Sequence, residues 1–247
     1  MTEAKTVNAK CEEWRHVYCQ RRFGILLVIL IALLAGSPVV MGFGMSAGWF
    51  DGLMLLVLLA AVQSLCFERR QRMFALLVGT PTFVLCLAAN AFSGITNRSV
   101  LFVGHLCAVL FFFGSAALIV GSLFRPRSLT LDSMFGAVCG YLFLGLAWAM
   151  TYATIEVLSP HSFQISQSWP ASDEQKQAFV LIYYSFVTLT TLGYGDVIPI
   201  SPTTRTLAWI EAISGQFYLA IIVAGLVSIL VANAQRSSTH EVIDSPD

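Results

Sequence analysis

The chain has 247 residues, of which 57% are hydrophobic and only 11% are charged, whereas a soluble domain carries about a quarter charged residues. The mean hydropathy is +0.75 and the formal net charge is zero, so the composition favours a polytopic membrane protein and gives no reason to expect a nucleic-acid partner. The acidic residues inside apolar segments are isolated, with no His or Cys cluster beside them. We therefore expect neither an enzyme nor a bound cofactor.

Windows of about 20 predominantly apolar residues mark the helices that can cross a bilayer. Six spans are expected, and in chain order they cover residues 23–41, 49–67, 73–92, 100–124, 131–157 and 207–232. No small-residue cleavage motif follows the first apolar run, so we expect a retained helix and not a signal peptide. The predicted fold class is an all-α membrane protein with six transmembrane helices.

Lysine and arginine gather in the tail before the first span, in the turn at 68–72 and in the turn at 125–127. The loops after the first and third spans contain only Arg98. Because short loops rich in Lys and Arg stay in the cytoplasm, we expect a multi-pass protein of the cell membrane with both termini in the cytoplasm.

The fourth span lacks the signature of a voltage sensor. Voltage sensing needs arginines repeated through a spanning helix, but no Lys or Arg lies between Val100 and Phe124. Arg125 and Arg127 follow the span and are read as topology determinants. We therefore expect no voltage sensor in this part of the chain.

A shorter apolar segment at 178–190 lies between the fifth and sixth spans. At about 1.5 Å per residue it cannot cross roughly 30 Å of hydrocarbon as a helix. Non-helical backbone at membrane depth survives only when it is buried in protein or lines a water-filled cavity. The pattern predicts a re-entrant pore helix followed by a loop that other protein surrounds.

The loop itself carries glycine at alternate positions and reads Thr191-Leu192-Gly193-Tyr194-Gly195. Glycine tolerates positive φ, so such a run can point successive carbonyl oxygens the same way. A column of carbonyl oxygens replaces the hydration shell of a cation, and potassium channels build it from four Thr-Val-Gly-Tyr-Gly loops. With Asp196 after it, the segment closely resembles a potassium-channel selectivity filter, with Leu192 in place of valine.

This resemblance implies potassium ions bound at Thr191, Leu192, Gly193 and Tyr194, with Gly195 completing the filter. The chain contains one such motif and the filter needs four, so a homotetramer is expected. Beyond the filter, the stretches GAVCGYL at 136–142 and EAISGQFYLA at 211–220 are similar to the bacterial two-helix pore family of ion channels. A bacterial source would place the protein in the inner membrane.

The family resemblance also implies roles for single residues around the filter. Residues expected to support it are Thr190, Asp196, Tyr183 and Tyr184. Val187 stands where some channels have a glutamate behind the filter. Gly215 matches a gating glycine by its spacing from Asp196, although close packing against the pore helix is an alternative reason for a glycine there. Gly225 is a second, weaker hinge candidate.

We expect four parts in the chain. They are a cytoplasmic N-terminal tail at 1–22, a four-helix transmembrane region without a voltage sensor at 23–127, a pore domain at 128–233 and a short cytoplasmic tail at 234–247. The last part is too short for a regulatory domain. Any control is therefore expected from the pore, from membrane lipid or from a separate regulatory protein.

The leading functional prediction is passive, potassium-selective conduction. Two alternatives stay open: a weakly selective cation channel, in which Leu192 or altered packing softens the filter, and a membrane sensor or scaffold with a non-conducting filter. Among other ionisable residues, Glu156 is expected to be structural, for example beside Arg205, and Glu211 is left undecided. His105 is expected to be a hydrogen-bonded core residue.

Overall fold

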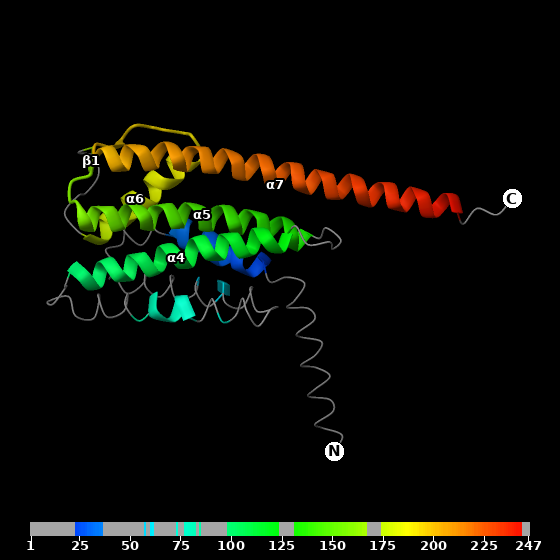
Figure 1. The fold of residues 1–247 in the computed structure, drawn as a ribbon, viewed down its shortest axis with the longest axis horizontal. Helices are drawn as coiled ribbons and strands as arrows, with labels where there is room; N and C mark the ends of the chain where they lie inside the picture. The colour runs from blue at the N-terminus through cyan, green and yellow to red at the C-terminus, as the bar shows by residue number, and fades with distance from the viewer. Residues whose placement is uncertain are drawn as a thin grey trace, which may run out of the picture.

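The computed structural model is mostly helical (Figure 1), as the composition predicts. It describes residues 23–36, 57, 60–61, 73, 77–82, 84, 98–123, 131–166 and 174–243. Several predicted features lie outside these residues: most of the second and third spans, the N-terminal tail, the last four residues of the chain, and Arg125 and Arg127.

Most of the described residues belong to five helices. Their bounds are Phe23–Gly36, α4 Arg98–Leu123, α5 Leu131–Leu158, α6 Glu174–Leu189 and α7 Pro202–Ile243. Of these, Arg98–Leu123 and Asp132–Leu158 are long and apolar enough to cross a membrane. The helices α6 and α7 both begin before the predicted starts at 178 and 207, and α7 continues through most of the predicted tail.

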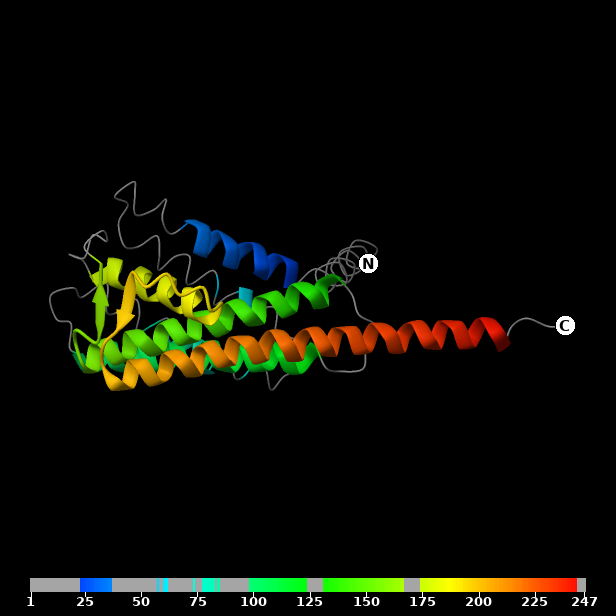
Figure 2. The same cartoon turned by 90° about the horizontal axis from the view of Figure 1, so that it is seen from above.

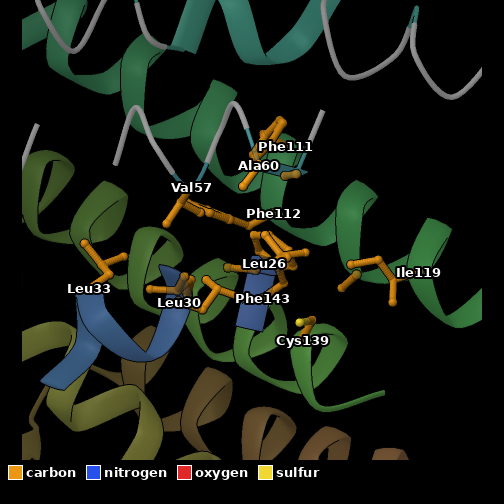
Figure 3. Close-up of a cluster of buried hydrophobic side chains, with 14 of the residues drawn as sticks. Leu26, Leu30, Leu33, Val57, Ala60, Phe111, Phe112, Ile119, Cys139 and Phe143 are labelled. Carbon is orange, nitrogen blue, oxygen red and sulfur yellow. The ribbon is translucent and has the colours of Figure 1, made fainter. Parts of the chain in front are cut away.

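The main buried core is formed mostly by side chains of the first helix, α4 and α5, and it also includes Val57, Ala60, Ala61 and Ile182 (Figure 3). Leu26, Leu30 and Leu33 recur at helical spacing and so lie on one face of the first helix. They pack with residues of α4 and α5, among them Phe111, Phe112, Ile119, Cys139 and Phe143. The start of the first helix is fixed to α5 because Phe23 and Gly24 donate their N–H groups to Asp132 at 3.0 and 3.2 Å.

Two short strands that the sequence analysis did not predict flank α6 and the loop that follows it. The strand β1 Phe163–Ile165 pairs antiparallel with β2 Val197–Pro199, and the N–H of Ser166 donates to the carbonyl of Asp196 at 2.9 Å. The chain between them leaves and returns at the same end of the helix bundle (Figure 2). With 16 residues, α6 is about 24 Å long.

The helix α7 begins immediately after β2. Ser201 caps it by accepting the N–H of Thr204 at 3.1 Å, and Pro202 occupies the first helical position, where its fixed φ is favourable. With 42 residues, α7 spans about 63 Å. It runs antiparallel to α5 and extends well beyond the other helices (Figures 1 and 2).

Candidate ion-binding site

The backbone after α6 turns its N–H groups back toward that helix. The amides of Leu192 and Gly193 donate to the carbonyl of Val187 at 2.9 and 3.2 Å, and the amide of Thr191 donates to Thr188 at 2.9 Å. In a trans peptide the N–H and the preceding C=O point in opposite directions. The carbonyls of residues 190–192 therefore point away from α6, on the same side of the chain.

Positive φ recurs at every second residue of this loop. The angles are 59° at Thr191, 58° at Gly193 and 79° at Gly195. Leu192 and Tyr194, between these residues, do not have positive φ. Such alternation can direct successive N–H groups to one side, which leaves the carbonyls on the other. Thr191 is β-branched, so its left-handed conformation costs about 1–3 kcal/mol, the kind of strain that is concentrated at functional sites.

The open side of this loop faces away from its own chain. Nothing lies within 4 Å of where a Cβ would stand on Gly193 or Gly195, and the side chains of Leu192 and Tyr194 are 55% and 68% exposed. Below the loop is an open recess, lined by Thr191, Ala212, Ile213, Gln216 and Phe217. The amide nitrogen of Gln216, a residue that sequence reasoning missed, lies 3.5 Å from the Thr191 hydroxyl.

The two tyrosines of α6 take different positions behind the loop. Tyr183 donates its hydroxyl to Asp196 at 2.8 Å, which links the middle of α6 to the end of the loop. Tyr184 is buried and packs edge-on against Tyr152 and Phe163, with ring centroids 5.2 and 5.0 Å away. The Thr190 hydroxyl donates to the carbonyl of Phe186, one turn earlier in α6, at 2.7 Å.

Removal of the Tyr183 hydroxyl tests this link. A hydrogen bond to a charged group contributes about 1.5–3 kcal/mol, so we expect Tyr183→Phe to lower the melting temperature of the purified protein by several degrees. A double-mutant cycle with Asp196→Ala, which removes both acceptor oxygens, supplies the control, because the two losses are then less than additive. Fully additive losses would show that the hydroxyl and the carboxylate do not interact.

One face of α7 packs against α5 and α6 through four residues at helical spacing, Glu211, Ser214, Gly215 and Tyr218. Glu211 accepts from Tyr152 at 2.6 Å, and Trp148 donates to Ser214 at 3.1 Å. A Cβ on Gly215 would stand only 2.2 Å from the carbonyl oxygen of Leu189, and Tyr218 donates to the carbonyl of Ala137 at 2.6 Å. The structure thus gives Gly215 a packing role within an anchored face, while the proposed hinges at Gly215 and Gly225 stay predictions.

The remaining ionisable residues have structural partners or lie apart from the loop. Glu156 accepts the N–H groups of His161 and Ser162 at 2.7 and 3.1 Å, and the Nε of Arg205 donates to a carbonyl, that of Pro199, at 3.1 Å. The Nδ1 of His105 is buried without a hydrogen-bond partner among the described residues, and the expected hydrogen-bonded core histidine stays a prediction.

Comparison with known proteins assigns a domain to this region. A family model described as "Ion channel" matches residues 140–232. Protein LctB of Geobacillus stearothermophilus is 34% identical over 127 residues, which make up 51% of this chain and 92% of that protein. Protein LctB of Bacillus caldotenax is 34% identical over 131 residues, with the same two shares.

A shorter match joins the chain to Two-pore potassium channel 5 of Arabidopsis thaliana, with 34% identity over 50 residues, 20% of this chain and 12% of that protein. No solved structure matches the chain significantly. The ion channel domain and the apolar helices indicate a membrane protein. The chain belongs to the family of Protein LctB, and its residues 140–232 form an ion channel domain.

Proposed function

We propose that this protein is a potassium-selective channel that conducts passively through a homotetrameric pore. The observation that carries the proposal is the loop backbone, whose N–H groups turn toward α6 while positive φ recurs at Thr191, Gly193 and Gly195. This arrangement supplies carbonyl oxygens on one side of the chain, which is what a dehydrated cation requires. The short match to a potassium channel covers a small part of the chain and adds modest support.

The exposure of the loop in a single chain supports the proposed tetramer. A non-helical backbone at membrane depth must be surrounded by protein or water, yet Gly193 and Gly195 face open space. On α7, Trp209, Ile213 and Phe217 recur at i, i+4 and i+8 and are between 44% and 63% exposed. Four chains around one axis would cover both this stripe and the loop.

The strand pair supports a re-entrant pore helix. Because β1 and β2 hold both ends of the excursion together, α6 and the loop enter and leave at one surface. We propose that this surface faces outward and that both termini are cytoplasmic, in the bacterial inner membrane. The carbonyl end of α6 then points toward the recess below the loop, where its partial negative charge favours a cation.

Ion flux into liposomes distinguishes this function from its alternatives. Purified protein reconstituted at known density is expected to give a large potassium flux and little sodium flux. Comparable fluxes of both ions would indicate the weakly selective channel, and absence of flux from correctly assembled tetramers would indicate a sensor or scaffold. Cross-linking of the same preparation checks that four chains are present.

A conductance–voltage curve tests the absence of a voltage sensor. Moving one charge across 100 mV supplies about 2.3 kcal/mol, and steep gating needs several charges per subunit. The helix α4 has a single cation, Arg98, whose side chain donates to the carbonyls of Val157 and Leu158 at the end of α5 at 2.6 and 2.7 Å. We therefore expect a shallow curve, and a curve as steep as that of a voltage-gated channel would contradict this expectation.

A further inference from the structure

Glu211 joins three helices behind the loop while fully shielded from solvent. Its side chain has no exposed area in the chain. One carboxyl oxygen accepts from Tyr152 of α5 at 2.6 Å, and the other lies within hydrogen-bonding distance of the Ser185 hydroxyl of α6. The same Ser185 oxygen lies 2.7 Å from the carbonyl of Gly145 on α5.

The number of protons in this cluster defines the state of Glu211. For each of the three oxygen–oxygen contacts to hold its own proton, three protons are needed, but the Tyr152 and Ser185 hydroxyls supply one each and the Gly145 carbonyl supplies none. In this arrangement the third proton lies on Glu211. In that state Glu211 donates to Ser185, Ser185 donates to Gly145, and Tyr152 donates to Glu211.

The surroundings favour the same state. Among the described residues, the ionisable groups that act on Glu211 are Tyr141 and Tyr152 of α5 and Tyr184 of α6. All three are neutral hydroxyls at physiological pH, so none supplies the positive charge that a buried carboxylate needs. A neutral acid carries no such requirement.

We propose that Glu211 is held protonated and acts as a positioning residue that fixes α6 against α5 and α7. Ser185 lies two residues before Val187, whose carbonyl accepts the first two N–H groups of the loop after Thr191. A displacement of Ser185 is therefore transmitted directly to the backbone that presents the carbonyls. Loss of the proton at alkaline pH would leave Ser185 with one hydrogen for two acceptors, Glu211 and the Gly145 carbonyl, so one of these two bonds would be lost. It would also bury a negative charge behind the loop, so conduction would fall as the pH rises.

This inference rests on the proposed function for its flux readout, and infrared spectroscopy tests it without any ion flux. In wild-type protein we expect the carbonyl stretch of a protonated carboxylic acid at neutral pH, and its loss in Glu211→Gln. The matched control is Glu156→Gln, which removes a glutamate whose two oxygens accept from backbone N–H groups and need no proton. Absence of the band in wild type, or its persistence in Glu211→Gln, would overturn the proposal even if the protein conducts.

The flux experiment uses the same variants. The glutamine amide can donate to Ser185 while its carbonyl accepts from Tyr152, so Glu211→Gln is expected to conduct like wild type at neutral pH and to lose the alkaline decline. Glu211→Ala, which keeps neither bond, is expected to lose most of the flux at every pH. A wild-type flux that stays constant into the alkaline range while the infrared band disappears would refute the positioning role, as would an unchanged decline in Glu211→Gln.

Discussion

Replacement of Gly195 by alanine is expected to abolish selective potassium conduction. The residue has φ of 79° and nothing within 4 Å of its added Cβ, so the penalty comes from the backbone and not from a clash. A left-handed conformation costs an L-residue about 1–2 kcal/mol, or roughly 4–8 kcal/mol over four copies in a tetramer. The loop is expected to relax to negative φ, which turns one carbonyl in each chain out of alignment. Flux of potassium and sodium into liposomes measures the result.

The matched control is Leu192→Val, next to the same glycines. Leu192 is outside the set of residues with positive φ in the described chain, and valine gives the sequence of known potassium-channel filters. We expect this variant to keep both assembly and selectivity. If Gly195→Ala and Leu192→Val both kept wild-type selectivity, the alternating positive φ of the loop would not be the cause of selectivity.

Replacement of Gly215 by alanine is expected to abolish conduction and lower the melting temperature. The added Cβ would stand 2.2 Å from the Leu189 carbonyl oxygen, a carbonyl that also accepts the Tyr141 hydroxyl at 3.3 Å. The obstacle is backbone at the end of α6, so α7 or the loop must shift. Overpacking of this kind costs about 1–3 kcal/mol or more in each chain. Flux and thermal unfolding in detergent measure the two effects.

The control for Gly215→Ala is Gly121→Ala in α4. Nothing lies within 4 Å of an added Cβ at Gly121, and alanine is favoured over glycine inside a helix by about 1 kcal/mol. This variant is expected to be at least as stable as wild type and to give the same flux. A Gly215→Ala protein that assembles, stays selective and only opens less often would instead support a hinge at this position.

The sequence predicted those parts of the fold that depend on residues close together in the chain. The apolar runs that became α4 and α5 exceed the bilayer length by themselves, and the filter resemblance rests on six consecutive residues, Thr191–Asp196. The starts of α6 and α7 were predicted too late because Glu174 and Pro202 open polar first turns. A hydropathy window excludes such turns, whereas a proline after a capping serine was an available signal.

Contacts between distant residues were beyond prediction from the sequence. Glu211 meets partners 59 and 26 positions away, and the Asp132 carboxylate that caps the first helix lies 109 positions from Phe23. The strand β1 has three residues, too few to show an alternating pattern. For Gly215 the sequence left a hinge and packing against the pore helix both open, because the packing partner is the backbone carbonyl of Leu189, which no sequence pattern identifies.

The reversal potential of single channels under bi-ionic conditions tests the central claim most directly. With potassium on one side of a planar bilayer and sodium on the other, the reversal potential depends on the relative permeability of the loop to the two ions. The proposed column of carbonyls at residues 191–194 predicts a reversal potential displaced far from zero, in the direction set by potassium permeation. A reversal potential near zero, from channels that Gly195→Ala silences, would contradict potassium selectivity while leaving an ion-conducting pore.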